Sequence, residues 1–84
     1  MLSSWLIDRL EEMKDEQILL VQDPLRLLPE TDGAVHRFAN ENDFTVIIDS
    51  TILVFRELYY KATAAKYTNK LLVIDRAPVR RRTH

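Results

Sequence analysis

The chain contains no cysteine, so disulfide bonds and thiolate metal sites are excluded. Its single glycine, Gly33, rules out the glycine-rich dinucleotide fingerprint and the Walker loop, since each needs several glycines. No uninterrupted apolar run exceeds four residues, whereas a membrane-spanning helix needs about 20. The first residues carry acids and no basic n-region, which does not predict a signal peptide. These absences together predict a cytoplasmic protein.

What is present predicts one small folded domain. The 84 residues are 46% hydrophobic and 30% charged, enough for a single core. Residues 1–74 carry eight basic and twelve acidic side chains, while residues 75–84 carry four arginines and one aspartate. We therefore expect an α/β domain over residues 1–78 and a basic tail or linker over residues 79–84. A mildly acidic body attracts nucleic acid weakly, and only through that tail.

Helices and strands alternate in the predicted secondary structure. Ser3 or Ser4 can cap a first amphipathic helix, Thr31 or Asp32 a second, and Asp49, Ser50 or Thr51 a third. Strands are expected at residues 17–22, 44–48 and 71–74, because each run is apolar on both faces. The apolar stripes that should face the core are, for the first helix, Leu2, Trp5, Leu6, Leu10 and Met13, for the second, Val35, Phe38 and Ala39, and for the third, Ile52, Phe55, Leu58, Tyr59 and Ala62.

The order α–β–α–β–α–β indicates an α/β fold, a small Rossmann-like three-layer α/β/α arrangement with a parallel three-stranded sheet. Right-handed crossovers leave strand order 2-1-3 or 1-2-3, and 2-1-3 is favoured because it places helices on both faces of the sheet. Both edges of so small a sheet would be open. We therefore expect either a fragment of a longer protein or an assembly that covers an edge.

Each predicted strand ends on an aspartate: Asp23, Asp49 and Asp75. Parallel strands bring these residues to one edge of the sheet, where they could bind Mg²⁺ as in a degenerate receiver-like domain. Aspartate is also favoured where a strand passes into a helix, because its carboxylate caps free N–H groups. A receiver needs a second acid beside the first strand and a lysine on a later strand, and neither is present. The structural interpretation is therefore favoured, with no cofactor expected.

Other residue types offer no catalytic constellation. His36 and His84 lie 48 positions apart without a second ligand at helical spacing, and no Ser–His pair is evident. The residues that could bind a protein partner are Trp5, Tyr60 and the tail arginines Arg80, Arg81 and Arg82. Trp5 is expected to pack against the sheet of its own chain, with docking on a second copy or a partner as the alternative. Tyr59 is expected in the core and Tyr60 at its margin.

Three stretches together resemble a known family: "ILLVQDPLRLLPE", "FTVIIDSTILVFRELYYKA" and "NKLLVIDRAP". They resemble the N-terminal segment of PglZ-type proteins of bacterial phage-exclusion (BREX) systems. The similarity covers roughly residues 17–78 and rests on the apolar pattern, on Asp23-Pro24 and on the stretch from Arg56 to Tyr60.

The resemblance implies a non-catalytic accessory domain. PglZ-type proteins look like metal-dependent members of the alkaline phosphatase superfamily, but that catalytic domain lies beyond this segment, and its metal-binding motif is not present here. We therefore expect an interaction domain that docks onto another component of an antiviral defence system or onto itself, with no enzymatic activity of its own. A magnesium-binding receiver-like domain is the alternative.

Overall fold

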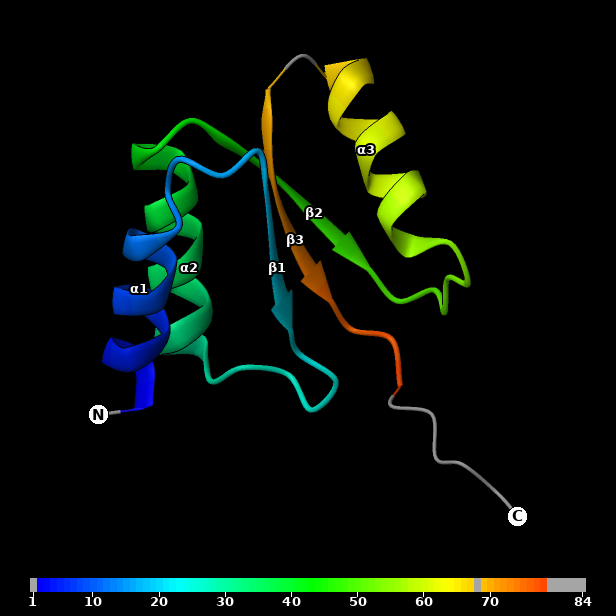
Figure 1. The fold of residues 1–84 in the computed structure, drawn as a ribbon. Helices are drawn as coiled ribbons and strands as arrows, with labels where there is room; N and C mark the ends of the chain where they lie inside the picture. The colour runs from blue at the N-terminus through cyan, green and yellow to red at the C-terminus, as the bar shows by residue number, and fades with distance from the viewer. Residues whose placement is uncertain (1, 68, 79–84) are drawn as a thin grey trace.

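The computed structural model describes residues 2–67 and 69–78 of the chain. Helices and strands alternate in the predicted order (Figure 1). The six elements are α1 (Leu2–Glu12), β1 (Ile18–Gln22), α2 (Pro29–Glu41), β2 (Phe44–Asp49), α3 (Arg56–Tyr67) and β3 (Lys70–Asp75).

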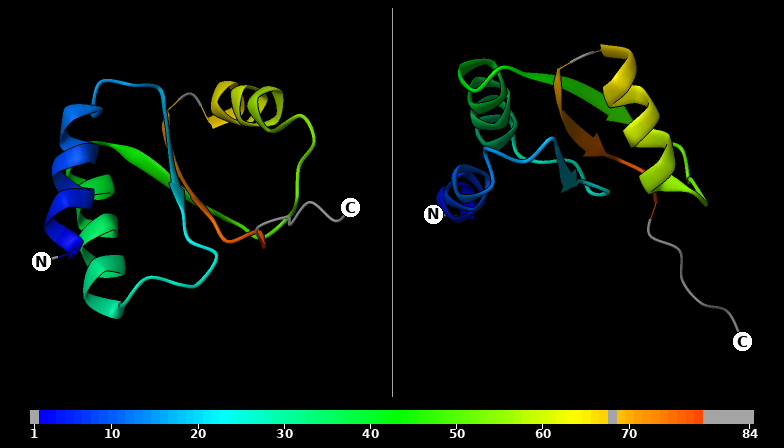
Figure 2. Two further views of the ribbon diagram at one scale, coloured as in Figure 1. Left: turned by 60° about the horizontal axis from the view of Figure 1, so that its bottom comes forward. Right: turned by 45° about the horizontal axis from the view of Figure 1, so that its top comes forward.

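The three strands form one parallel sheet in the order β1-β3-β2. Helices α1 and α2 cover one face of the sheet and α3 the other, so the predicted three-layer α/β/α architecture is confirmed (Figures 1 and 2). The chain crosses from β1 to β2 on one face and returns from β2 to β3 on the other, as crossovers of one hand require. We call these surfaces the α2 face and the α3 face of the sheet.

The observed strand order differs from the favoured order 2-1-3, in which the first strand would be central. The third strand is central instead, and its four residues from Leu71 to Ile74 are completely buried. The outer strands each leave an apolar side chain substantially exposed, Leu20 on β1 and Ile48 on β2. The strand whose four middle residues are all buried and apolar thus gains most from being covered on both faces and paired along both edges.

The core on the α2 face is the larger of two. Alternate residues of the strands point into it, as the period of two requires. Helix α1 contributes Leu10, with Leu6 and Ile7 packed against the cluster, and Phe38 of α2 stacks on Phe44 of β2 with ring centroids 5.7 Å apart. The buried members are Leu10, Leu19, Val21, Val35, Phe38, Ala39, Phe44, Leu72 and Ile74.

Helix α1 does not bury the full stripe that its sequence predicts. Trp5 is 61% exposed and Met13 is also exposed, whereas Leu10 is buried. The side of α1 that faces the core carries Leu6, Ile7 and Leu10, because α1 packs beside α2 and contacts the core only through that side. The expectation that Trp5 packs in the core is therefore wrong.

Helix α2 begins earlier than its predicted caps. Pro29 occupies its first turn after Leu28, whose side chain makes no capping hydrogen bond, and Thr31 lies inside the helix. Proline suits this position because its missing N–H would have no helical partner there. The helix ends at Glu41: the backbone N–H and side chain of Asn42 both donate to the Phe38 carbonyl, and Asp43 turns the chain with a φ of 61°.

Helix α3 begins at Arg56, several residues after the predicted caps, and faces the opposite way from the prediction. Its buried residues are Tyr60 and Ala64, which pack with Leu71 and Val73 on the α3 face. The predicted core stripe points outward instead, with Phe55 73% exposed. This second core is small, so the sheet is covered more thinly on this face.

No helix among residues 2–67 and 69–78 is long and apolar enough to cross a membrane.

Candidate functional site

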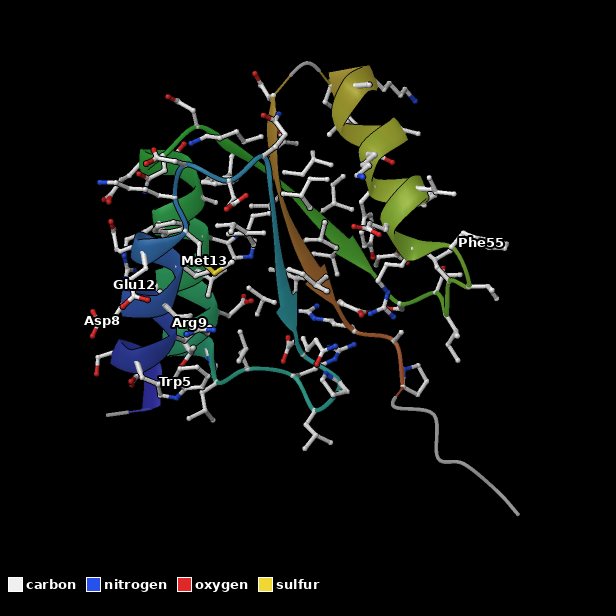
Figure 3. The ribbon with its side chains drawn as sticks, viewed as in Figure 1. Trp5, Asp8, Arg9, Glu12, Met13 and Phe55 are labelled. Atoms are coloured by element: carbon white, nitrogen blue, oxygen red, sulfur yellow. The ribbon has the colours of Figure 1, made fainter. Side chains whose placement is uncertain are left out.

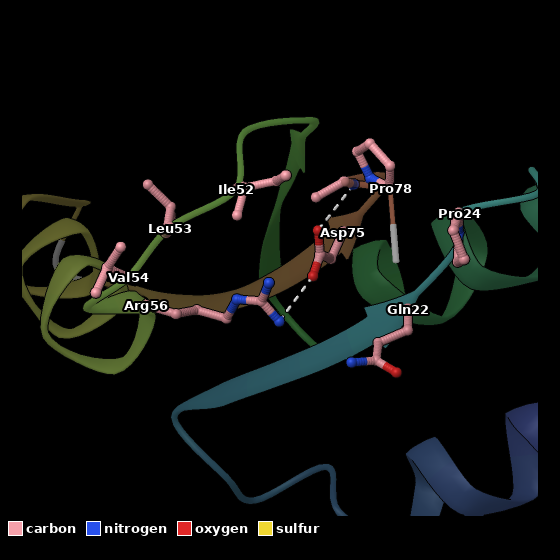
Figure 4. Close-up of a pocket in the computed structure, with 9 residues that line it drawn as sticks. Gln22, Pro24, Ile52, Leu53, Val54, Arg56, Asp75 and Pro78 are labelled. Carbon is pink, nitrogen blue, oxygen red and sulfur yellow. Dashed lines mark hydrogen bonds and ion pairs between the residues drawn. The ribbon is translucent and has the colours of Figure 1, made fainter. Parts of the chain in front are cut away.

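The carboxyl edge of the sheet carries the first candidate site. The chain leaves β1 toward α2 and leaves β2 toward α3, so a crevice opens at the end of the central strand β3, where parallel α/β sheets commonly bind ligands. A pocket of about 410 Å³ occupies this position (Figure 4). Its lining combines one ion pair with mainly apolar walls, formed by Gln22, Pro24, Ile52, Leu53, Val54, Arg56, Asp75, Ala77 and Pro78.

Asp75 is buried at the base of this pocket, and both of its carboxylate oxygens have partners. The Arg56 Nη1 atom lies 2.9 Å from Asp75 Oδ2, and the Ala77 backbone N–H donates to Oδ1 at 3.0 Å. Figure 4 shows the Arg56 side chain extending from the start of α3 to this carboxylate. The pair therefore joins the first residue of α3 to the last residue of β3.

Asp49 makes the same kind of turn at the end of β2. Its Oδ1 accepts the Thr51 backbone N–H at 2.8 Å, and its Oδ2 lies 3.5 Å from the Tyr60 hydroxyl. Burial raises the pKa of Tyr60 to about 12, and the carboxylates of Asp49 and Asp75 add to this effect because they disfavour a phenolate beside them. Tyr60 is thus a neutral hydrogen-bond donor across the ordinary pH range.

Asp23 is buried after β1 and pairs with a different arginine. Arg76 Nε lies 3.2 Å from Asp23 Oδ2, and Arg76 Nη2 lies 3.5 Å from Asp32 Oδ1 on α2. The His36 Nε2 atom lies 3.7 Å from the same Asp32 oxygen. Arg76 therefore ties the end of β3 to the end of β1 and to α2.

The three aspartates therefore do not converge on one point. Two of them cap the turn that follows their strand, as the structural interpretation predicted, and Asp23 and Asp75 each have an arginine as ionic partner. Throughout residues 2–67 and 69–78, no three His, Cys, Asp or Glu side chains are arranged to hold a metal ion. The geometry does not bring Asp23, Asp49 and Asp75 together as ligands of one cation.

This edge holds the layers together. Backbone bonds continue the ladder past the strands, from the Asp23 N–H to the Asp75 carbonyl and from the Arg76 N–H to the Asp49 carbonyl, both at 2.7 Å. Across the described part of the chain, every buried side-chain nitrogen or oxygen has a hydrogen-bond partner. The pocket can accept an apolar group, but its two charged side chains, Arg56 and Asp75, already pair with each other.

The outer surface of α3 is the second candidate site, and we define it by Val54, Phe55, Leu58 and Tyr59. These side chains are 81%, 73%, 66% and 47% exposed. Figure 3 shows Phe55 at the start of α3, on the far side of the molecule from Trp5 and Met13. Two exposed apolar residues just before α3 thus adjoin two on its outer side, and such contiguous patches often mark interaction sites.

Sequence reasoning assigned three of these residues, Phe55, Leu58 and Tyr59, to the core. The signal that it missed is a second stripe at a spacing of four, in which Arg56, Tyr60 and Ala64 recur on the opposite side of the helix. That stripe can pack on the sheet because Arg56 forms an ion pair with the buried Asp75. Helix α3 is thus apolar on two sides.

A third apolar region lies between α1 and the open edge of β1. A groove of about 550 Å³ runs there, with Trp5 of α1 and Met13, which follows the helix, on one side and Leu20 of β1 on the other. Trp5, a predicted partner-binding residue, is therefore accessible. The structure places Tyr60, the other aromatic candidate, in the core, 4% exposed, which corrects that prediction. Arg80, Arg81, Arg82 and His84 lie outside the described residues.

Comparison of the chain with protein-family models, with curated proteins and with solved structures gives no significant match.

Proposed function

We propose that this chain is a non-catalytic interaction domain that binds a protein partner through the outer surface of α3. The observation that carries the proposal is the exposure of Val54, Phe55, Leu58 and Tyr59 at the start of a helix whose other side already packs on the sheet. Exposed apolar clusters of this kind are typical of protein–protein contact sites, because covering them removes apolar area from water.

The polar groups at the sheet edge support an accessory role over an enzymatic one. Asp49 and Asp75 cap turns, and Asp23 and Asp75 are neutralised by arginines. A general base or a metal ligand needs a carboxylate that is available to substrate or cation. The resemblance to PglZ-type N-terminal segments suggests the setting: a cytoplasmic phage-defence assembly, whose partner is another component of that assembly or a second copy of this chain.

Site-specific photo-cross-linking in cells tests the proposal. A photoreactive residue replaces Leu58 on the outer surface of α3 or, as the matched control, Leu25 on the β1–α2 loop, which is 94% exposed and lies outside this surface. We expect a discrete cross-linked product from position 58 and none from position 25. The mass of the product separates self-association from a different partner. Equal labelling at both positions, or none at position 58, would contradict the proposal.

A further inference from the structure

We propose that the outer surface of α3 is self-complementary and binds a second copy of this chain. The two copies pair about a two-fold axis through an antiparallel contact between their α3 helices. This inference rests on the proposed interaction function and specifies its partner. It follows from the two-sided character of α3, from the apolar area exposed and from the distribution of side-chain size and charge along the helix.

Helix α3 has the pattern of a helix covered on both sides. Its inner side carries Arg56, Tyr60 and Ala64 against the sheet. On its outer side Phe55, Leu58, Tyr59 and Ala62 follow the spacing of three and four that defines one continuous helical face. The Tyr59 N–H bonds to the Phe55 carbonyl, so Phe55 belongs to this face although the helix begins at the next residue. A helix with apolar residues on opposite sides is normally buried.

The exposed area suits a small self-interface. On the scale of about 150–250 Å² for a fully buried aromatic side chain, the exposed fractions of Phe55 and Tyr59 amount to roughly 240 Å². Val54 and Leu58, which are 81% and 66% exposed, enlarge the patch further. The largest apolar patch on a typical monomer covers roughly 300–600 Å² and is often functional, and each partner in a standard interface buries roughly 800 Å².

The side chains are large at one end of this face and small at the other. Phe55, Leu58 and Tyr59 lie in its N-terminal half, and the exposed Ala62 and Ala65 lie in its C-terminal half. Antiparallel pairing about a point near residue 60 places Phe55 against Ala65 of the second copy and Leu58 against its Ala62. Large residues then fill the space that small ones leave, as close packing requires. Parallel pairing would set large against large and leave a gap between the alanines.

The position of Lys66 favours the same orientation. Lys66 lies on the same face, four residues after Ala62, at its C-terminal end. In an antiparallel pair the two copies of Lys66 are displaced to opposite ends, roughly 18 Å apart along the helix axis at 1.5 Å per residue. That separation exceeds the screening length of about 8 Å at physiological salt, whereas parallel pairing would place the two ammonium groups side by side.

Sedimentation of the purified chain over a range of concentrations measures the association. We expect a reversible dimer with a dissociation constant in roughly the micromolar range, as suits a contact of this size. Leu58→Glu should weaken dimerisation at least tenfold, and Leu25→Glu, the same change at an exposed leucine of the β1–α2 loop, should leave it unchanged. Circular dichroism confirms that both variants are folded. A chain that is monomeric throughout, or a dimer indifferent to Leu58→Glu, would overturn the proposal.

Cysteine cross-linking tests the orientation, because the chain has no native cysteine to interfere. Leu58→Cys and Ala62→Cys are prepared as separate proteins, mixed and oxidised. Antiparallel pairing predicts a disulfide-linked heterodimer between the two variants, since facing residues come within the 4.4–6.8 Å between Cα atoms that a disulfide needs. Leu25→Cys mixed with either variant should give only background. Homodimers of Leu58→Cys that outnumber this heterodimer would indicate parallel pairing and overturn the proposed orientation.

The two proposals fail separately. A monomer in solution whose position 58 cross-links to a different protein in cells would reject the second copy as occupant and keep the interaction function. A chain that neither dimerises nor cross-links at position 58 would reject both.

Discussion

Arg56 Nη1 and Asp75 Oδ2 lie 2.9 Å apart, in an ion pair whose carboxylate side chain is only 5% exposed. The pair joins the first residue of α3 to the end of the central strand. Because Arg56 shares its side of the helix with Tyr60 and Ala64, the contact requires α3 to turn that side toward the sheet. The larger apolar side chains then face solvent.

Removing this cation should destabilise the domain. Arg56→Met keeps most of the side-chain volume but leaves Asp75 as an unpaired buried carboxylate, and breaking one partner of a buried pair typically costs about 3–5 kcal/mol. We expect a loss of about 3 kcal/mol in the free energy of unfolding, measured by urea denaturation. The matched control is Lys61→Met on the exposed side of α3, which should change stability by less than about 0.5 kcal/mol. Equal effects would show that Asp75 does not need Arg56.

The packing of α1 predicts a contrast between two of its residues. Leu10→Ala should cost about 2–5 kcal/mol, because a buried side chain is replaced by a cavity. Trp5→Ala should cost less than about 1 kcal/mol, since most of the indole is already in water. Thermal unfolding followed by circular dichroism compares the two. A Trp5→Ala variant that fails to fold would restore the interpretation of Trp5 as a core residue.

The buried phenol of Tyr60 predicts a loss of stability at high pH. Its pKa is raised to about 12 in the folded state from 10.0 in the unfolded chain, so the stabilisation is fully present below pH 10. Above pH 10 the unfolded state releases the proton first, and stability falls by about 2–3 kcal/mol by pH 12. Tyr60→Phe should remove this component, which urea denaturation at several pH values would detect. Identical pH profiles for the two proteins would contradict the assignment.

The arrangement of the aspartates predicts indifference to divalent cations. Thermal unfolding with and without about 10 mM Mg²⁺ should give midpoints within about 1 °C of each other. A site with a dissociation constant of about 0.1 mM would instead add roughly 2.7 kcal/mol and raise the midpoint by several degrees. The purified domain should likewise leave generic phosphodiesters intact with Mg²⁺, Mn²⁺ or Zn²⁺. Turnover that is lost in Asp49→Asn would contradict the non-catalytic proposal.

Local patterns were sufficient for much of this protein. Runs apolar on both faces, separated by amphipathic stretches, predict the six elements, the parallel sheet and the three layers, because periodicity and crossover handedness depend only on the chain. The interpretation of the strand-end aspartates as turn caps also follows from local chemistry. It is confirmed at Asp49 and Asp75, where a backbone N–H two residues on reaches the carboxylate.

Other features were decided only when the elements packed together. Which strand is central depends on comparing the burial of all three, and β3 is the one without an exposed apolar residue. Which side of α3 faces inward depends on Asp75, a residue 19 positions from Arg56 that no helical periodicity includes. The stripe from Phe55 to Ala62 is the stronger amphipathic signal, yet it faces solvent. The opposite side carries Arg56, which pairs with the buried Asp75. Helical periodicity cannot predict this contact, because it takes account only of apolar residues within the helix itself.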